Sequence, residues 1–193
     1  NHTGPVTEKD PVWPVEWVRT APPCTYKSYE TTISCTLVEN LPDILTGFDI
    51  AGTNLPGQKL SGDYFDYIKL PNGHLGTAVA DVSGKGVPAA LFMAKAISLI
   101  QQMGDTPPHQ AMAALNDALE SGNENCMFVT LFLGVLDLNT GVLEFASGGH
   151  TPPILLRDGK ATELPQDDGP ALALSPDLEF PRNQLQLVSG DRL

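Results

Sequence analysis

The sequence predicts an α+β domain in which antiparallel strands are grouped before and after a pair of helices. Three observations lead to this fold class. Apolar segments flank a Pro-Asn-Gly turn at 71–73, which predicts a β-hairpin. Residues 86–103 and 106–122 carry apolar side chains at helical spacing. Residues 127–136 and 142–147 follow as two further apolar strands separated by a turn.

The turn at 71–73 also sets the register of the hairpin. Proline fits the first central position of a type I turn, Asn the second, and Gly supplies the positive φ that follows. The resulting three-residue loop pairs Leu70 with His74 and, counting outward, Asp63 with Asp81. Two carboxylates at opposed positions repel each other, which indicates a cation between them. A two-residue Asn-Gly turn would instead place Asp63 opposite Val82, and two solvated aspartates at strand ends are the plainer alternative.

A short glycine-rich segment follows this pair and leads into the first helix. Its residues are Ser83, Gly84, Lys85 and Gly86. The N–H groups and the dipole at a helix start favour oxyanions, so the segment and the aspartates together predict metal and phosphate chemistry. The GxxxxGK[ST] pattern of a P-loop is absent from the sequence. Lys85 is expected either to contact substrate phosphate or only to close the loop.

The helices and the first strand carry further expectations about the core. The side chains expected to face it are Leu91, Ala94, Ile97 (or Ser98) and Ile100 in the first helix, and Met112, Leu115 and Leu119 in the second. Thr106 is expected to cap the second helix through its hydroxyl. Residues 48–52 are expected to form the first core strand, and Cys126 is expected to be a buried thiol.

Composition and charge narrow the function classes. The formal net charge of −12 argues against a nucleic-acid-binding surface and against binding to anionic membranes. No run reaches the roughly 18 apolar residues of a membrane span. The three cysteines lack metal-ligand spacing and only one His lies near the motifs, so a zinc site is disfavoured. Cysteine-based catalysis is disfavoured because the cysteines lack a His/Asp partner pattern, while a Cys24–Cys35 bridge stays open. The reducing cytoplasm is the expected compartment, including as the cytoplasmic part of a membrane-anchored sensor.

Three segments resemble the SpoIIE/RsbU-like branch of the metal-dependent protein phosphatases (PPM, the phosphatase 2C superfamily). They are SGDYFDY at 61–67, ADVSGKGVPAALFMA at 80–94 and MFVTLFLGVLDLNTGVLEFASGGHTPPILL at 127–156. The resemblance implies a PPM-type α-β-β-α sandwich, with two stacked antiparallel sheets flanked by helix pairs and metals at one end between the sheets. Residues 1–40 are expected to be a linker or a fragment of an upstream regulatory region, and residues 41–193 the phosphatase domain.

The resemblance also implies a site and an activity. In this family the aspartates of the first two motifs, and the main-chain carbonyl after the second aspartate, bind a pair of Mn²⁺ or Mg²⁺ ions. By position these ligands are Asp63, Asp81 and Val82. The implied reaction is hydrolysis of a phosphoserine or phosphothreonine on a protein by a metal-activated water. Asp66 is a candidate for orienting the ligands, although strand alternation puts it on the opposite face. His150, in a Gly-His-x-Pro-Pro motif, is expected to shape the site.

The implied substrate is a phosphorylated STAS-domain anti-anti-sigma factor of bacterial partner-switching signalling. The upstream sensor region is a second implied partner, and a homodimer stays open. In relatives the Gly-Asp-Arg-Leu segment at 190–193 leads into a strand and a Thr-Asp-Gly motif with a further metal ligand. Neither feature follows here, so the domain is expected to lack its C-terminal elements. The alternative is a pseudophosphatase that binds a phosphoprotein without hydrolysing it; a cyclase-like enzyme is disfavoured because no purine-recognition pattern is visible.

Overall fold

The computed structural model describes residues 47–50, 52 and 62–193, and the expectation for residues 1–40 lies outside them. It confirms the predicted α+β class. A five-stranded antiparallel sheet has the order β1-β2-β3-β4-β7, and a second sheet pairs β5 with β6. The strands are β1 (Asp63–Lys69), β2 (His74–Val82), β3 (Val129–Asp137), β4 (Val142–Gly148), β5 (Ile154–Arg157), β6 (Lys160–Glu163) and β7 (Asn183–Gln186).

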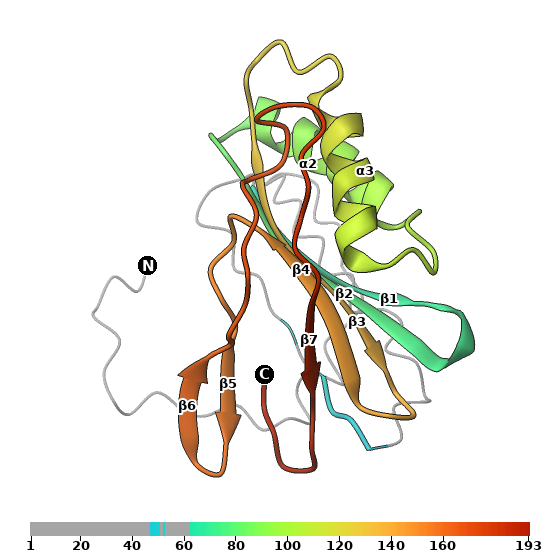
Figure 1. Cartoon of the computed structure of the whole chain (residues 1–193). Coiled ribbons are helices and arrows are strands. Elements are labelled where there is room, and N and C mark those ends of the chain that lie inside the picture. The colour runs from blue at the N-terminus through green and yellow to red at the C-terminus, as the bar shows by residue number, and fades with distance from the viewer. Residues whose placement is uncertain (1–46, 51, 53–61) are drawn as a thin grey trace, which may run out of the picture.

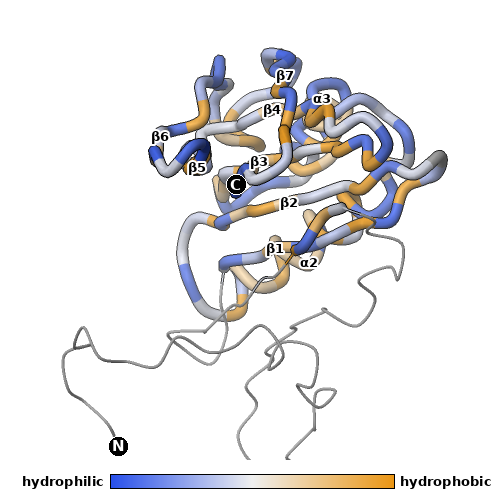
Figure 2. The backbone as a smooth tube through the Cα atoms, turned by 90° about the horizontal axis from the view of Figure 1, so that it is seen from below, coloured by the Kyte–Doolittle hydropathy of each residue, from blue (hydrophilic) through white to orange (hydrophobic). Residues whose placement is uncertain are grey.

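Two helices cover one face of the five-stranded sheet (Figure 1). They are α2 (Val87–Ile100) and α3 (Pro108–Glu120). Neither is long and apolar enough to cross a lipid bilayer, and the same holds for every helix in the described part of the chain. The β5–β6 hairpin stands apart from the helices (Figure 1), and all four residues of β6 are exposed. Figure 2 colours the chain by hydropathy and shows the same arrangement from below.

The predicted register of the first hairpin is confirmed. The turn at Pro71–Gly73 is a single 3-10 turn, and Gly73 takes a φ of +77°. The Leu70 N–H donates to the His74 carbonyl at 3.0 Å. Asp63 is therefore paired with Asp81 in the β1–β2 ladder, as the three-residue loop requires.

The helix-facing side of β2 is lined by small residues, and this decides how α2 packs. Ala78 and Ala80 are fully buried there, and the helix meets the sheet through Ala89, Met93, Ala96 and Ile100. The predicted contact face of α2 was therefore wrong in part, because Leu91 and Ala94 are exposed although Ile100 is buried. Small residues on both partners let the helix approach closely, and a leucine at that contact would hold it away.

The expectations for α3 are confirmed for its core side chains and wrong for its cap. Met112, Leu115 and Leu119 are buried. Thr106 does not cap the helix, because the helix begins at Pro108 with Pro107 in the capping position. A proline at the first helical position has no N–H to satisfy, and the main-chain carbonyl of Pro107 already accepts two N–H groups of the first turn.

The other face of the sheet has a separate, aromatic core. Phe132 and Phe145 stack there with ring centroids 5.4 Å apart, and Leu164 packs on them from beyond β6. Phe48 and Ile50 also reach this core, although the described residues of the predicted strand at 48–52 do not form a strand. Cys126 was predicted to be buried and is exposed, because β3 begins only at Val129 and Cys126 lies in the preceding loop.

The last residues of the chain are tied to β5 by an ion pair. Arg157 donates from Nε and Nη2 to the two oxygens of Asp191 at 2.8 and 2.5 Å. The Asp191 side chain is only 4% exposed, and its carboxylate also accepts the Val188 N–H. Beside it, Leu156 and Arg192 exchange two main-chain hydrogen bonds of 2.8 and 3.0 Å. Asp191 is thus occupied in holding this segment on β5.

Replacing Arg157 by methionine is expected to speed amide hydrogen exchange at Leu156 and Arg192. The change removes the charged fork and keeps a side chain of comparable length. The hydrogen bonds from Arg157, with that from Val188, lower the pKa of Asp191 to about 2. The stabilisation is therefore complete above the ordinary pKa of an aspartate and is lost as the pH falls toward 2.

The matched control is Arg182→Met, which removes a more exposed ion pair with Glu144. Exchange should be followed by NMR at neutral pH. Equal amide exchange rates at Leu156 and Arg192 in the two variants would show that the Arg157–Asp191 ion pair does not hold this segment.

Candidate metal centre

The predicted metal-binding aspartates lie together at one end of the five-stranded sheet. Asp63 opens β1, and Asp81 is the penultimate residue of β2. Both lie on the sheet face turned away from the helices, because side chains alternate along a strand and their neighbours Tyr64 and Ala80 pack on the helix side. Direct cross-strand neighbours have Cβ atoms about 4.5–5.5 Å apart, a span that one cation can bridge.

A glycine keeps the space beside this pair open. A Cβ built on Gly62 would lie 3.0 Å from the Val82 carbonyl oxygen and 3.5 Å from Asp81 Oδ1. Any side chain there would therefore crowd the two oxygens that, with Asp63, form the predicted ligand set. The donors are all oxygens, which fits Mg²⁺ or Mn²⁺ better than zinc. The residues present thus fit the ions that the sequence predicts.

The electrostatics of Asp81 are those of a crowded carboxylate. Desolvation by its surroundings raises the pKa of Asp81, and the neighbouring Asp63 carboxylate raises it further, whereas His150 opposes the rise. The like-charge pair is therefore costly without a counter-ion. Within residues 47–50, 52 and 62–193, no group of three or more His, Cys, Asp and Glu side chains is arranged to hold a metal.

His150 lies at this end of the sheet, in a tight turn that follows β4. Gly149 takes a φ of +64°, and a Cβ on it would lie 3.0 Å from the Ala171 nitrogen. The Gly149 N–H donates to the Gly169 carbonyl at 2.8 Å and to the Asp168 carboxylate at 3.1 Å. Burial lowers the pKa of His150, while the charges of Asp81 and Asp168 act in the opposite direction. The imidazole therefore lies among carboxylates at the candidate centre.

Thr130 belongs to the site and was missed by the sequence analysis. It is paired with Asp81 across the β2–β3 ladder, so Asp81 has Asp63 on one side and Thr130 on the other. Its Oγ1 lies 2.9 Å from Nδ1 of His150 and 3.4 Å from the main-chain carbonyl oxygen of Asp81. The only sequence signal for it is its place as a hydroxyl residue within the otherwise apolar run at 127–136.

The glycine-rich segment is held at its first residue and open after it. Ser83 exchanges two hydrogen bonds of 2.9 Å with the main chain of Phe128, one of them through its hydroxyl. Gly84 and Gly86 take φ values of +89° and +79°. Lys85 is exposed at the start of α2. Ser83 thus fixes the segment to the residue that precedes β3, while Lys85 stays accessible to a ligand.

Asp66 is placed on the helix side of β1, away from Asp63 and Asp81. It is buried, and its carboxylate accepts hydrogen bonds from the Tyr64 hydroxyl at 2.5 Å and from Gln101 Nε2 at 3.1 Å. Burial, followed by the bond to Asp66, raises the pKa of Tyr64 far above its ordinary value. The structure therefore brings Asp66 to the end of α2 and not to the candidate ligands.

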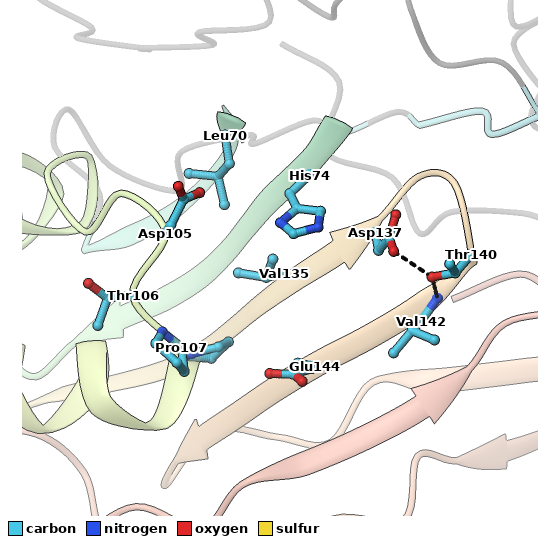
Figure 3. Close-up of a pocket in the computed structure, with 11 residues that line it drawn as sticks. Leu70, His74, Asp105, Thr106, Pro107, Val135, Asp137, Thr140, Val142 and Glu144 are labelled. Atoms are coloured by element: carbon cyan, nitrogen blue, oxygen red, sulfur yellow. Dashed lines mark hydrogen bonds between the residues drawn. The ribbon is translucent and has the colours of Figure 1, made fainter. Parts of the chain in front are cut away.

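A groove of about 320 Å³ lies at the opposite end of the sheet (Figure 3). His74, Asp105, Asp137 and Glu144 line it. The Asp137 carboxylate already accepts the Thr140 hydroxyl at 2.6 Å, and Glu144 is paired with Arg182. Because Asp137 and Glu144 are already engaged within the protein, the groove is a weaker candidate for a metal centre than Asp63 and Asp81.

Comparisons with known proteins identify a matching family and its members. The family model described as Stage II sporulation protein E (SpoIIE) matches residues 71–193. Phosphoserine phosphatase RsbU of Bacillus subtilis is 30% identical over 149 residues, which are 75% of this chain and 44% of that protein. The chain therefore spans less than half the length of this relative.

Solved structures give the same fold. The RsbU and RsbW domains of Rv1364c from Mycobacterium tuberculosis match 71% of this chain and 38% of that one, with a TM-score of 0.61 and 28% identity. RsbX in complex with magnesium matches 72% of this chain and 67% of that one, with a TM-score of 0.58 and 20% identity. The predicted phosphatase 2C-type fold is thereby confirmed.

In the metal-free protein, Asp63→Asn is expected to lower the pKa of Asp81. The substitution removes the second cause of the raised pKa and keeps the first, desolvation, so the value should fall but stay above that of an ordinary aspartate. Because a raised carboxyl pKa makes the fold lose stability as the pH rises through it, the variant should also lose less stability between acidic and neutral pH. Carboxyl ¹³C shifts followed against pH measure the pKa, and melting temperatures measure the stability.

Asp105→Asn in the remote groove is the control and should leave the Asp81 titration unchanged. An Asp81 pKa that does not fall in Asp63→Asn would contradict the electrostatic pairing of the two carboxylates.

Proposed function

The chain belongs to the SpoIIE family, and from this premise we propose that it is the catalytic part of a metal-dependent protein serine/threonine phosphatase. The proposed reaction is the hydrolysis of a phosphoserine or phosphothreonine with Mn²⁺ or Mg²⁺ as cofactor. The observation that supports it most is the Asp63–Asp81 cross-strand pair beside the Val82 carbonyl. Two opposed carboxylates repel each other and destabilise the strand pair unless a cation lies between them, and the space beside Gly62 leaves room for one.

Each residue of the site has a separate task in this proposal. Asp63, Asp81 and the Val82 carbonyl would hold the ions. When bound, a pair of such ions would supply a water molecule of lowered pKa and would offset charge on the phosphoryl oxygens. Gly84, Lys85 and Gly86 would guide the phosphate, since the open N–H groups at the start of α2 and the lysine charge both attract anions.

The proposed substrate is a phosphorylated STAS-domain anti-anti-sigma factor, acting in the cytoplasm. Its support is the likeness to the phosphoserine phosphatase RsbU and to a protein whose RsbU and RsbW domains were solved together. An upstream regulatory region and a second copy of the chain are the further proposed partners. The net charge of −12 favours cationic cofactors and disfavours nucleic acid as a partner.

The test is release of phosphate from a phosphoserine STAS protein by the intact protein in the presence of Mn²⁺. Asp63→Ala and Asp81→Ala are each expected to reduce the rate at least about 100-fold, because each removes a ligand of the ions on which the reaction depends. Calorimetry should show weaker Mn²⁺ binding in both variants.

Asp105→Ala serves as the matched control, since it removes an exposed carboxylate at the far end of the sheet. Stable binding of the phosphoprotein without phosphate release in either metal would overturn the enzyme and support a pseudophosphatase in its place. If phosphate is still released after both aspartate substitutions, the reaction does not take place at this centre.

A further inference from the structure

Thr130 connects two parts of the candidate centre that are far apart in the sequence. It pairs with Asp81 across the β2–β3 ladder, and its hydroxyl lies 2.9 Å from Nδ1 of His150. The imidazole comes from the turn after β4, twenty residues later. A hydrogen bond at one ring nitrogen, together with a main chain fixed on both sides, leaves the ring little freedom to turn.

The main chain of His150 is fixed by groups that are themselves buried. The Ser147 hydroxyl, in a fully buried side chain, donates to the His150 carbonyl at 3.3 Å. A Cβ on Gly148 would lie 2.5 Å from Leu172 Cδ1, so the turn packs directly on the core. The direction in which His150 projects is therefore set by the fold.

The second ring nitrogen of His150 is available to a ligand. Among the described residues, the buried side-chain nitrogen and oxygen atoms without a partner are His109 Nδ1 and Gln166 Oε1, and Nε2 of His150 is not one of them. No residue of the described chain is hydrogen-bonded to Nε2 either, so this atom is at least partly exposed to solvent. It belongs to a ring that interacts with the charge of Asp81.

We propose that Thr130 is a positioning residue that holds His150 so that Nε2 donates a hydrogen bond to the phosphoryl group of the substrate. The inference rests on the proposed phosphatase function and deepens it by adding a phosphate contact supplied by the chain itself. His150 then touches the substrate, and Thr130 acts only through His150.

The tautomer follows from the contact with Thr130. A threonine has one hydroxyl hydrogen, which can go to His150 Nδ1 at 2.9 Å or to the Asp81 carbonyl at 3.4 Å. Donation to Nδ1 uses the shorter contact and puts the ring hydrogen on Nε2, where it faces a phosphoryl oxygen. In a neutral ring the other assignment leaves a lone pair on Nε2, which repels that oxygen. Bound phosphate therefore selects the first arrangement.

The kinetic test uses the intact protein with Mn²⁺ and a phosphoserine peptide. Thr130→Val keeps the shape of the side chain and is expected to lower kcat/KM about tenfold, the effect of one lost hydrogen bond, with the Mn²⁺ affinity unchanged. Thr130→Ser keeps the hydroxyl and should stay within about twofold of the unaltered protein. In a His150→Ala background, Thr130→Val should have no further effect.

Thr77→Val is the matched control. Thr77 is half-buried on the same face of β2, and its hydroxyl has no hydrogen bond within the described residues. Additive effects of Thr130→Val and His150→Ala would overturn the inference, as would a loss in Thr130→Val that Thr130→Ser fails to restore. A parallel loss of Mn²⁺ affinity would also overturn it, because Thr130 would then act through Asp81.

An NMR experiment decides the inference without turnover. In the Mg²⁺-loaded protein, ¹⁵N signals of His150 are recorded while inorganic phosphate is added. Phosphate is expected to shift Nε2 in the unaltered protein and in Thr130→Ser, and not in Thr130→Val. An Nε2 signal that ignores phosphate while the enzyme still turns over would sink this inference and leave the phosphatase proposal standing. If Nε2 responds to phosphate but the protein never releases phosphate from the substrate, the contact between His150 and phosphate stands and the phosphatase proposal fails.

Discussion

The repulsion between Asp63 and Asp81 is the constraint around which the described structure is built. Two like charges at opposed positions of neighbouring strands oppose pairing, so other contacts must keep the strands in register. The turn at 71–73 fixes that register from one end. The pairing of β2 with β3 along its whole length, and the burial of its small residues under α2, hold it from the sides.

Strand β2 serves the core and the site at once because its side chains alternate. Ala78, Ala80 and Val82 face the helices and are buried, while Asp81 faces the other way. A shift of one residue would bury the carboxylate and expose the alanines, so core packing itself enforces the position of Asp81. This is why a site with unfavourable internal electrostatics can sit on a stable strand.

Local patterns predicted the parts of the molecule that depend on nearby residues. The hairpin register followed from three turn residues, and the core side of α3 followed from its helical spacing. The face of α2 could not be read in the same way, since that helix is apolar on several sides and its contact is set by the small residues of β2. Strand β7, Asn-Gln-Leu-Gln, has no apolar run, and only its pairing with β4 makes it a strand. Thr130 and His150 meet only because β3 begins at the end of the sheet where the antiparallel β4 finishes.

Helix α3 influences the candidate metal centre indirectly, through the buried side-chain amide of Asn116. Asn116 is fully buried, accepts the Ala173 N–H at 2.9 Å and donates to the Ser175 carbonyl at 2.9 Å. Ala173 and Ser175 belong to the loop between β6 and β7. This loop pairs with the start of β3 through Leu172 and with the end of β4 through Gly169. A buried amide that loses its hydrogen-bond partners costs free energy, so Asn116 holds the loop in one position. The turn that carries His150 packs on this loop, and α3 therefore helps to place the imidazole beside Asp81 from the other face of the sheet.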